Sequence, residues 1–396
     1  MKFDATTFKL TEFKSVQKRS LIIGILGLLV TAVGYFINTD QFFFSYLIAY
    51  LFWVSIALGA LFFVLLFHLT GTIWGVAIRR ILETLIKILP ILAVFFIPIL
   101  FGVHHLYHWS HVADVATDPI LSKKVGYLNI PFFAIRTAFY FGIWYLIAQK
   151  LYKTSIVMDS GATIDQIQKL RKISAPSMII FALTTTFASF DWIMSLYPHW
   201  YSTIFGLYFF SGGLVGVLGF MIYFGLYLNK RGVMNEIITV EHYHNLATFT
   251  FGFIIFWGYM AFSQYLLIWY ANIPEETIFY LQRSQGTWSI LNKTLVIGHF
   301  AIPFVGLLTR NSKRNFTYLK YMALFILAMH WIDLYWVVMP TLHKTGIKFS
   351  IFDLTSLIGI GGIFMWLFWT QFGKHAITPY RDPKFMKSVK HEVPYS

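Results

Sequence analysis

Cysteine is absent from this 396-residue chain. Without thiols, the chain can form no disulfide, hold no iron–sulfur cluster through thiolates, and attach no haem through a Cys-x-x-Cys-His motif. Charged residues are also scarce, at 12% of the sequence against about 25% in soluble domains. The sequence contains neither a Walker motif nor a dinucleotide-binding glycine motif. These absences argue against a soluble nucleotide-dependent enzyme and against a thiolate-bound redox centre in this chain.

Apolar and aromatic residues dominate instead, at 57% and 20% of the sequence. A membrane-spanning helix needs about 20 mainly apolar residues. Ten such segments occur, so the sequence predicts an all-α polytopic membrane protein with ten transmembrane helices. The first is expected to be retained, because no small-residue cleavage site follows it. The predicted spans are 20–37, 42–69, 85–104, 130–148, 177–197, 201–228, 245–270, 289–308, 318–338 and 351–371.

The net charge of +14 follows a pattern typical of membrane topology. Of the 31 Lys and Arg residues, 24 fall on one side of the predicted spans and six on the other, while Arg136 lies within a span. Cytoplasmic loops carry an excess of Lys and Arg. The bias therefore predicts that both termini lie in the cytoplasm. It also accounts for the charge without a nucleic-acid partner.

Three connections are long enough to contact a partner. The longest cytoplasmic one, 149–176, contains Thr163 and Gln166 at the spacing of a helix capping box. We therefore expect a short basic helix there, on the membrane surface or against a partner. The connections 105–129 and 271–288 lie on the opposite side. A plain solvated loop is an equally good interpretation of each.

The sequence also contains an internal duplication. A shift of 157 residues aligns the second predicted span with the sixth, and a shift of 142 aligns the fifth with the ninth. Spans 2–5 and 6–9 therefore form two four-helix units, which are parallel because four is an even number. The predicted divisions are a first span (1–41), two units (42–200 and 201–340), and a last span with a basic tail (341–396). Matched positions are Ser45 with Ser202, Gly59 with Gly216, Arg136 with Lys293, Asp191 with Asp333, and Pro198 with Pro340.

Asp191 and Asp333 are carboxylates inside apolar spans. Ionisable groups within a bilayer are costly, and they are usually paired or functional. Because Arg136 and Lys293 lie at similar depths, we expect an Arg136–Asp191 pair in one unit and a Lys293–Asp333 pair in the other. Such pairs serve either as a proton or ion relay or as contacts that fix helix register. Lys293 has a further alternative, which is to extend outward without a partner.

Two histidines, His299 and His330, lie near the middle of the eighth and ninth spans. On facing helices they can ligate a b-type haem, but the first unit has no equivalent histidines. The favoured interpretation is hydrogen bonding or proton transfer between His330 and Asp333, which lie one helical turn apart. Toward the cytoplasmic side, His68 and Glu83 either feed protons to this path or belong to a solvated rim.

Four histidines cluster at the outer end of the third span. In a continuous helix, three of them, His104, His108 and His111, would share one face. A metal site is conceivable there, but no carboxylate stands at matching spacing. Histidines at the membrane interface are the favoured interpretation. The sequence therefore predicts no metal site and no catalytic residue in this chain.

Two stretches resemble a known family. Residues 188–202 read ASFDWIMSLYPHWYS, residues 45–60 read SYLIAYLFWVSIALGA, and the similarity continues around Phe67 and His68. With ten spans in two parallel units, the chain resembles the polysulfide-reductase membrane-subunit (NrfD-like) family. Within that family it is most similar to the ActF-type membrane subunits of bacterial alternative complex III. The resemblance covers nearly the whole chain.

The resemblance implies a membrane subunit of a respiratory quinol:cytochrome c oxidoreductase in the bacterial inner membrane. Haem c and iron–sulfur clusters are then expected in partner subunits: a multihaem cytochrome c, an iron–sulfur protein and an NrfD-like sister subunit, with lipids and a terminal oxidase as further partners. This chain would support assembly and a proton path through Asp191 and Asp333, and whether it binds quinone stays open. The alternative is a stand-alone secondary transporter built from two repeats, but its matched prolines would lie at span ends rather than at the midplane.

Overall fold

The computed structural model describes residues 13–393 of the chain. Within them all regular structure is helical, and ten segments are long and apolar enough to cross a membrane. The predicted all-α, ten-span architecture is therefore confirmed. The N-terminal lysines before residue 13 lie outside the described residues. The spans are α1 (Lys14–Ile37), α2 (Thr39–Thr70), α3 to α5 (Arg79–Ile86, Leu89–Phe95, Ile97–Phe101), α9 (Ile130–Val157), α10 (Ile164–Trp192), α11 (Phe205–Lys230), α12 (Val240–Ala271), α14 and α15 (Trp288–Thr294, Ile302–Gly306), α17 (Phe316–Val338) and α18 (Ile351–Phe372).

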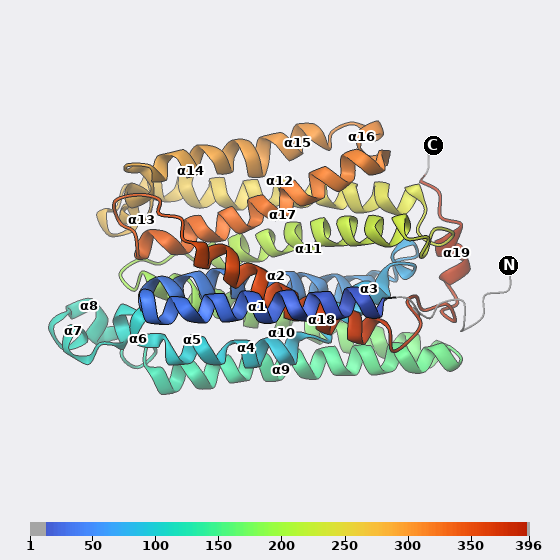
Figure 1. The fold of residues 1–396 in the computed structure, drawn as a ribbon, viewed down its shortest axis with the longest axis horizontal. Helices are drawn as coiled ribbons and strands as arrows, with labels where there is room; N and C mark the ends of the chain where they lie inside the picture. The colour runs from blue at the N-terminus through green and yellow to red at the C-terminus, as the bar shows by residue number, and fades with distance from the viewer. Residues whose placement is uncertain (1–12, 394–396) are drawn as a thin grey trace.

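The long helices lie side by side along one direction (Figure 1). One end of the bundle, here called the loop end, holds the short helices of the connections 105–129 and 271–288. The other, the tail end, holds α19 and both ends of the described chain. An even number of spans places both ends on one side, as the charge pattern predicts. The short helices are α6 (Val103–Leu106), α7 (Val112–Thr117), α8 (Pro119–Lys124), α13 (Pro274–Ser284), α16 (Arg310–Arg314) and α19 (Phe385–Val389), with single turns η1 (Trp74–Val76), η2 (His108–Ser110), η3 (Met158–Ser160), η4 (Met194–Leu196) and η6 (Met339–Thr341).

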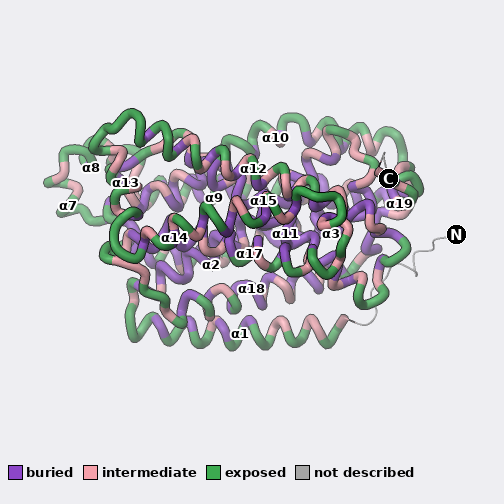
Figure 2. The backbone as a smooth tube through the Cα atoms, turned by 90° about the horizontal axis from the view of Figure 1, so that it is seen from above, coloured by how far each residue is buried: buried purple, intermediate pink, exposed green. Residues whose placement is uncertain are grey.

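The helices α2 and α11, which the duplication aligns, form the centre of the bundle (Figure 2). In their most apolar stretches, 83% of α2 and 89% of α11 is buried, against 17% of α1. The two helices approach closely because small residues meet at their crossing. A Cβ added to Gly59 would lie 2.7 Å from the backbone oxygen of Gly213. The corresponding helices of the two repeats therefore pack directly against each other.

The remaining spans surround this central pair. In the first unit α2 packs against α3 and α10, and α10 packs against α9. In the second, α11 packs against α12 and α17. On one flank α1 lies along α18, and a Cβ on Gly24 or Gly27 would meet the backbone of α18 at 2.6 or 2.7 Å. This arrangement places Asp191 of α10 and Asp333 of α17 in separate groups of helices.

The connection 149–176 differs from the prediction. The capping box is present, since Thr163 and Gln166 exchange hydrogen bonds of 3.0 and 3.3 Å. However, the cap opens α10 itself, which runs without a break through Pro176, and α9 continues to Val157. The separate surface helix was a wrong prediction. Continuous helices satisfy their own backbone groups, and membrane helices tolerate an internal proline.

Two spans are interrupted. The third consists of α3, α4 and α5, with Pro90 and Pro98 in the first turns of α4 and α5. The eighth contains a π-helical segment, Leu295–Ala301, between α14 and α15, where Pro303 lies near the start of α15. A proline favours the first turn of a helix because it has no N–H to donate. The duplication aligns the third span with the seventh, so the two interruptions do not occupy equivalent positions.

Candidate functional site

The first buried acid, Asp191, lies at the loop end of α10 and faces Arg136 on α9. Arg136 donates through Nε and Nη2 to the two carboxylate oxygens at 2.8 and 2.9 Å, and Tyr140 donates a third hydrogen bond at 2.7 Å. The Asp191 side chain is fully buried, and that of Arg136 is 9% exposed. The guanidinium also lies over the rings of Tyr127 and Phe132, at 3.8 and 4.3 Å. The predicted ion pair is present, and it gives Asp191 a permanent counter-charge.

The second buried acid, Asp333 on α17, is held differently. Its carboxylate accepts hydrogen bonds from the hydroxyl of Tyr208 on α11 and from Nε1 of Trp257 on α12, the latter at 3.1 Å. Asp333 is 3% exposed, and within residues 13–393 it forms no ion pair. Two neutral donors therefore replace the arginine of the first unit.

Lys293 lies on the exposed surface of α14, so the predicted Lys293–Asp333 pair is wrong. The physical reason is the cost of desolvating an ammonium group inside the bundle, which a lysine near a span end avoids by extending toward the membrane interface. Tyr208 and Trp257 satisfy the carboxylate without a second buried charge.

A buried arginine lies near this acid but does not neutralise it. Arg283 of α13 is fully buried, and it donates to the backbone oxygens of Trp336 and Val337 at 3.1 and 2.6 Å. Its guanidinium carbon lies 3.4 Å from the centre of the Phe279 ring. Burial lowers the pKa of Arg283 below its ordinary value. The side chain closes the loop end of α17, a role that its position in a predicted outer loop did not reveal.

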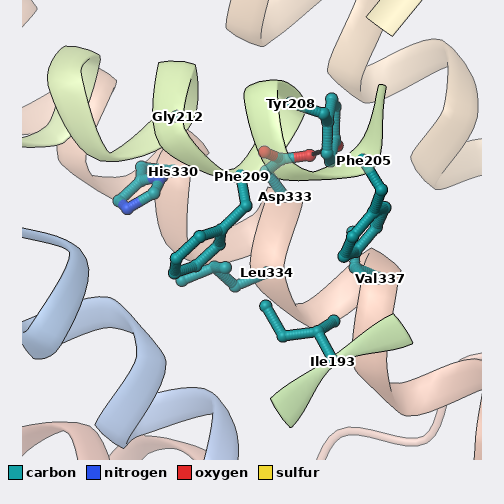
Figure 3. A pocket seen from close by; sticks show the side chains of 9 residues that line it. All are labelled: Ile193, Phe205, Tyr208, Phe209, Gly212, His330, Asp333, Leu334 and Val337. Carbon is teal, nitrogen blue, oxygen red and sulfur yellow. Dashed lines mark hydrogen bonds between the residues drawn. The ribbon is translucent and has the colours of Figure 1, made fainter. Parts of the chain in front are cut away.

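His330 and Asp333 line the same small cavity, together with Tyr208 and Gly212 (Figure 3). The cavity measures about 10 Å³, close to the smallest space that holds one water molecule. Nε2 of His330 lies 2.9 Å from the hydroxyl of Ser55, and Nδ1 has no partner in the described chain. The predicted hydrogen bond to Asp333 is therefore wrong: the ring turns Nε2 toward Ser55 of α2, and Nδ1 does not reach the carboxylate. The two side chains still share one cavity wall.

His299 lies in the π-helical segment, 1% exposed, and stacks on Trp257. The two ring centres are 4.0 Å apart and their planes differ by 6°. His330 is covered as well, since a Cβ on Gly216 would lie 2.8 Å from its ring. With these rings packed against protein, the residues do not fit a b-type haem between them.

An aromatic groove of about 650 Å³ opens beside Asp333. It lies between α12, α13 and α14, and both donors to Asp333, Tyr208 and Trp257, line it. Tyr259 and Phe262, which are 62% and 59% exposed, also line it and bring it to the outer surface of the bundle. The groove therefore connects the lipid-facing surface with the groups that bind the buried acid. The other lining residues are Ile255, Gly258, Ala261, Tyr265, Tyr280, Ser284, Asn292, Leu295, Val296, Phe300 and Trp336.

The residues predicted near the tail end do not join this cluster. His68 is half-buried, with an unpaired and buried Nε2. It lies 13 residues along α2 from Ser55, roughly 20 Å at 1.5 Å per residue. Glu83 is fully buried and accepts hydrogen bonds from Arg79 at 2.9 Å and from Ser155 at 2.7 Å. Glu83 is thus part of a buried ion-pair network rather than a solvated rim.

Sequence reasoning also missed the buried acid Asp353, at the loop end of α18. It is 3% exposed and accepts hydrogen bonds from Ser45 at 2.5 Å and from Gln41 at 3.1 Å. Its other oxygen accepts from the backbone N–H of Ser350 at 2.8 Å, which completes a capping box. The Ser350-x-x-Asp353 spacing was the signal that could have identified this cap.

Comparison with known proteins adds no family assignment. No protein-family model matches the sequence, and no curated protein matches it. The functional argument therefore depends on the fold, the buried acids and the groove.

Proposed function

We propose that this chain is a membrane subunit of a bacterial quinol:cytochrome c oxidoreductase of the alternative complex III type, and that its second unit binds quinone beside Asp333. The sequence resemblance in residues 45–60 and 188–202 supports the type of complex. The observation that carries the quinone site is the position of Tyr208 and Trp257. Both donate hydrogen bonds to Asp333, and both line an aromatic groove open to the bilayer.

The groove suits a flat, apolar ring with a hydrocarbon tail. Aromatic side chains favour stacked or edge-on contacts with such a ring, and small-molecule sites are mostly apolar with a few placed polar groups. Quinol oxidation supplies two electrons and two protons, and the electrons would pass to haem and iron–sulfur centres in partner subunits. Tyr208 stands between the groove and Asp333, so its hydroxyl can accept a proton from the groove while donating its own to the carboxylate.

The free-energy cost of placing this proton on the buried acid differs between the two units. Protonating Asp191 would leave Arg136 buried without a counter-charge, which costs several kcal/mol. Protonating Asp333 leaves no cation unpaired, because its donors are a phenol and an indole. We therefore assign proton exchange to Asp333, with His330 and the shared cavity beside it, and helix register to the Arg136–Asp191 pair.

The helix interruptions favour this proposal over a stand-alone transporter. Transporters built from repeats place broken helices at equivalent positions of the two halves, with the substrate between them. Here the third and eighth spans are interrupted, and the duplication does not align them. At the centre, where the repeats meet, α2 and α11 are in close contact through Gly59 and Gly213.

Two measurements test the proposal separately. Purification from native membranes is expected to yield the chain in a fixed ratio with a haem c protein and an iron–sulfur protein. A monodisperse chain without redox partners, transporting a solute in vesicles, would refute the complex.

The groove is tested with a photoreactive quinone analogue and the groove-filling variant Ala261→Trp. We expect labelling of groove peptides in the native protein and its loss in the variant. Ala138→Trp, on the exposed face of α9, is the matched control and should label normally. Equal labelling of both variants would place the quinone elsewhere, whatever complex the chain belongs to.

A further inference from the structure

Two histidines and a carboxylate meet at the loop end, in the connection between the third and fourth spans. His108 begins the single turn η2, His111 follows that turn directly, and Asp114 lies in α7 (Figure 1). Each offers one ligand atom, and the three atoms lie within 4.8 Å of one another. Nδ1 of His108 is 3.4 Å from a carboxylate oxygen of Asp114.

We propose that His108, His111 and Asp114 bind a divalent transition-metal ion, with Zn²⁺ as the best match. Imidazole nitrogen and carboxylate oxygen are ordinary zinc ligands at about 2.0–2.2 Å. Tetrahedral ligands at that distance lie roughly 3.4 Å from one another, which is the separation already present between His108 and Asp114. The side chains of His108 and Asp114 are each 50% exposed, and His111 is exposed as well. Small rotations can therefore bring the His111 ring to the same distance.

The backbone orients one of the ligands. Nδ1 of His111 lies 3.3 Å from the backbone oxygen of His108. A histidine that ligates a metal commonly donates its other ring N–H to a carbonyl oxygen, which fixes the tautomer. This contact would leave Nε2 of His111 for the ion. The turn therefore supplies both a ligand and its support.

The surroundings favour a cation. The segment 104–122 contains four histidines and two aspartates but no Lys or Arg, in a chain of net charge +14. His108 and Asp114 line an open surface pocket that Asp118 and His199, whose side chains are 2.5 Å apart, also line. Three protein ligands leave a coordination position open to this pocket for water.

This site could not be predicted from the sequence, because the spacing of the histidines was interpreted as that of one continuous helix. In the structure α6 ends at Leu106 and Tyr107 is extended, so His104 and His108 do not stack along one helical face. The turn that follows brings Asp114 back to His108 and supplies the carboxylate that seemed to be missing. A bound ion would tie η2 to α7 and so stiffen the connection 105–129.

The test uses the full-length protein, purified without a polyhistidine tag and stripped with a chelator. Zn²⁺ alone is titrated in competition with a chromophoric chelator. We expect one saturable site, weakened at least about tenfold in Asp114→Asn and in His111→Ala, since even supporting residues of metal sites contribute that much. His105→Ala is the control, because His105 is exposed in the same segment but pairs with Asp40 at 2.7 Å.

Hydrogen exchange gives an independent readout. Zn²⁺ should slow amide exchange across 103–124 in the native protein and in His105→Ala, but not in Asp114→Asn. Unsaturable binding, or equal affinity in all four proteins, would overturn the proposal. So would tight binding that leaves the exchange of this segment unchanged.

Discussion

Replacing Asp191 with asparagine should destabilise the protein far more than replacing Lys293, the sequence counterpart of Arg136, with methionine. The carboxylate accepts three hydrogen bonds, two from Arg136 and one from Tyr140. Asparagine removes the negative charge and turns one acceptor into a donor that faces the guanidinium. Arg136 is then a buried cation without a partner.

The structure sets the size of the effect. Breaking a buried ion pair by removing one partner costs about 3–5 kcal/mol. Arg136 keeps its hydrogen bond to the backbone oxygen of Tyr127 at 2.8 Å and its contacts with two aromatic rings, and 9% of its side chain is exposed. These remaining contacts place the expected loss at the lower end, about 3 kcal/mol.

The assay is reversible unfolding in mixed micelles, which gives the free energy of unfolding of each variant. Lys293→Met is the matched control, since substitution of an exposed residue outside a buried ion pair typically changes the free energy of unfolding by no more than about 0.5 kcal/mol. The double variant Arg136→Met/Asp191→Leu should recover most of the loss, because apolar replacement of a whole buried pair is often neutral. A cost for Asp191→Asn no larger than that of Lys293→Met would refute the reasoning.

Two further predictions concern local structure. Gly59→Ala should lower the free energy of unfolding by at least about 1 kcal/mol, as overpacking does, because the new Cβ would meet the backbone of α11. Gly142→Ala is the control: its Cβ would meet nothing within 4 Å, so the same unfolding assay should find it neutral or stabilising. The pKa of Asp118 lies below its ordinary value because the backbone N–H of Leu121, and then His199, donate to the carboxylate. The ionised Asp118 side chain, which caps α8, should therefore stabilise this helix fully above about pH 4 and less as the pH falls through the lowered pKa. Amide exchange in α8, corrected for its intrinsic rate, should accordingly rise only in acid. Exchange that is independent of pH, or equal in Asp118→Ala, would contradict this role of Asp118.

The fold could be predicted from the sequence because bilayer thickness and backbone satisfaction leave few options for long apolar segments. The ten spans followed from length and composition, and the duplication aligned α2 with α11, which the structure places at the centre. The Arg136–Asp191 pair was predictable because both residues lie in regular helices, where depth can be counted from the span ends. Counting residues from the span ends gave the wrong structure for the connection 149–176, where a separate surface helix was predicted. A polar segment can continue a membrane helix beyond the bilayer, as α10 does.

The second site was harder to predict because its geometry depends on irregular segments. Lys293 aligns with Arg136 in sequence, but it lies on the short helix α14, just before the π-helical segment, and faces outward. The groups that bind Asp333 are a tyrosine and a tryptophan, which are common in this chain and carry no distinguishing spacing. The groove arises from how α12, α13 and α14 pack, and no local pattern reports that. Asp114 was missed for a related reason, since a turn rather than a helix brings it to His108.

The central claim is that Asp333, and not Asp191, is the buried acid that exchanges protons. Hydrophobic carbodiimides enter the bilayer and react with protonated carboxyl groups, so labelling followed by peptide mass spectrometry compares the two acids in one experiment. We expect modification of Asp333, reached through the aromatic groove, with Asp191 protected by Arg136. We also expect less modification of Asp333 when a quinone analogue fills the groove. Labelling of Asp191 with Asp333 unmodified would show that Asp191 is the acid that exchanges protons.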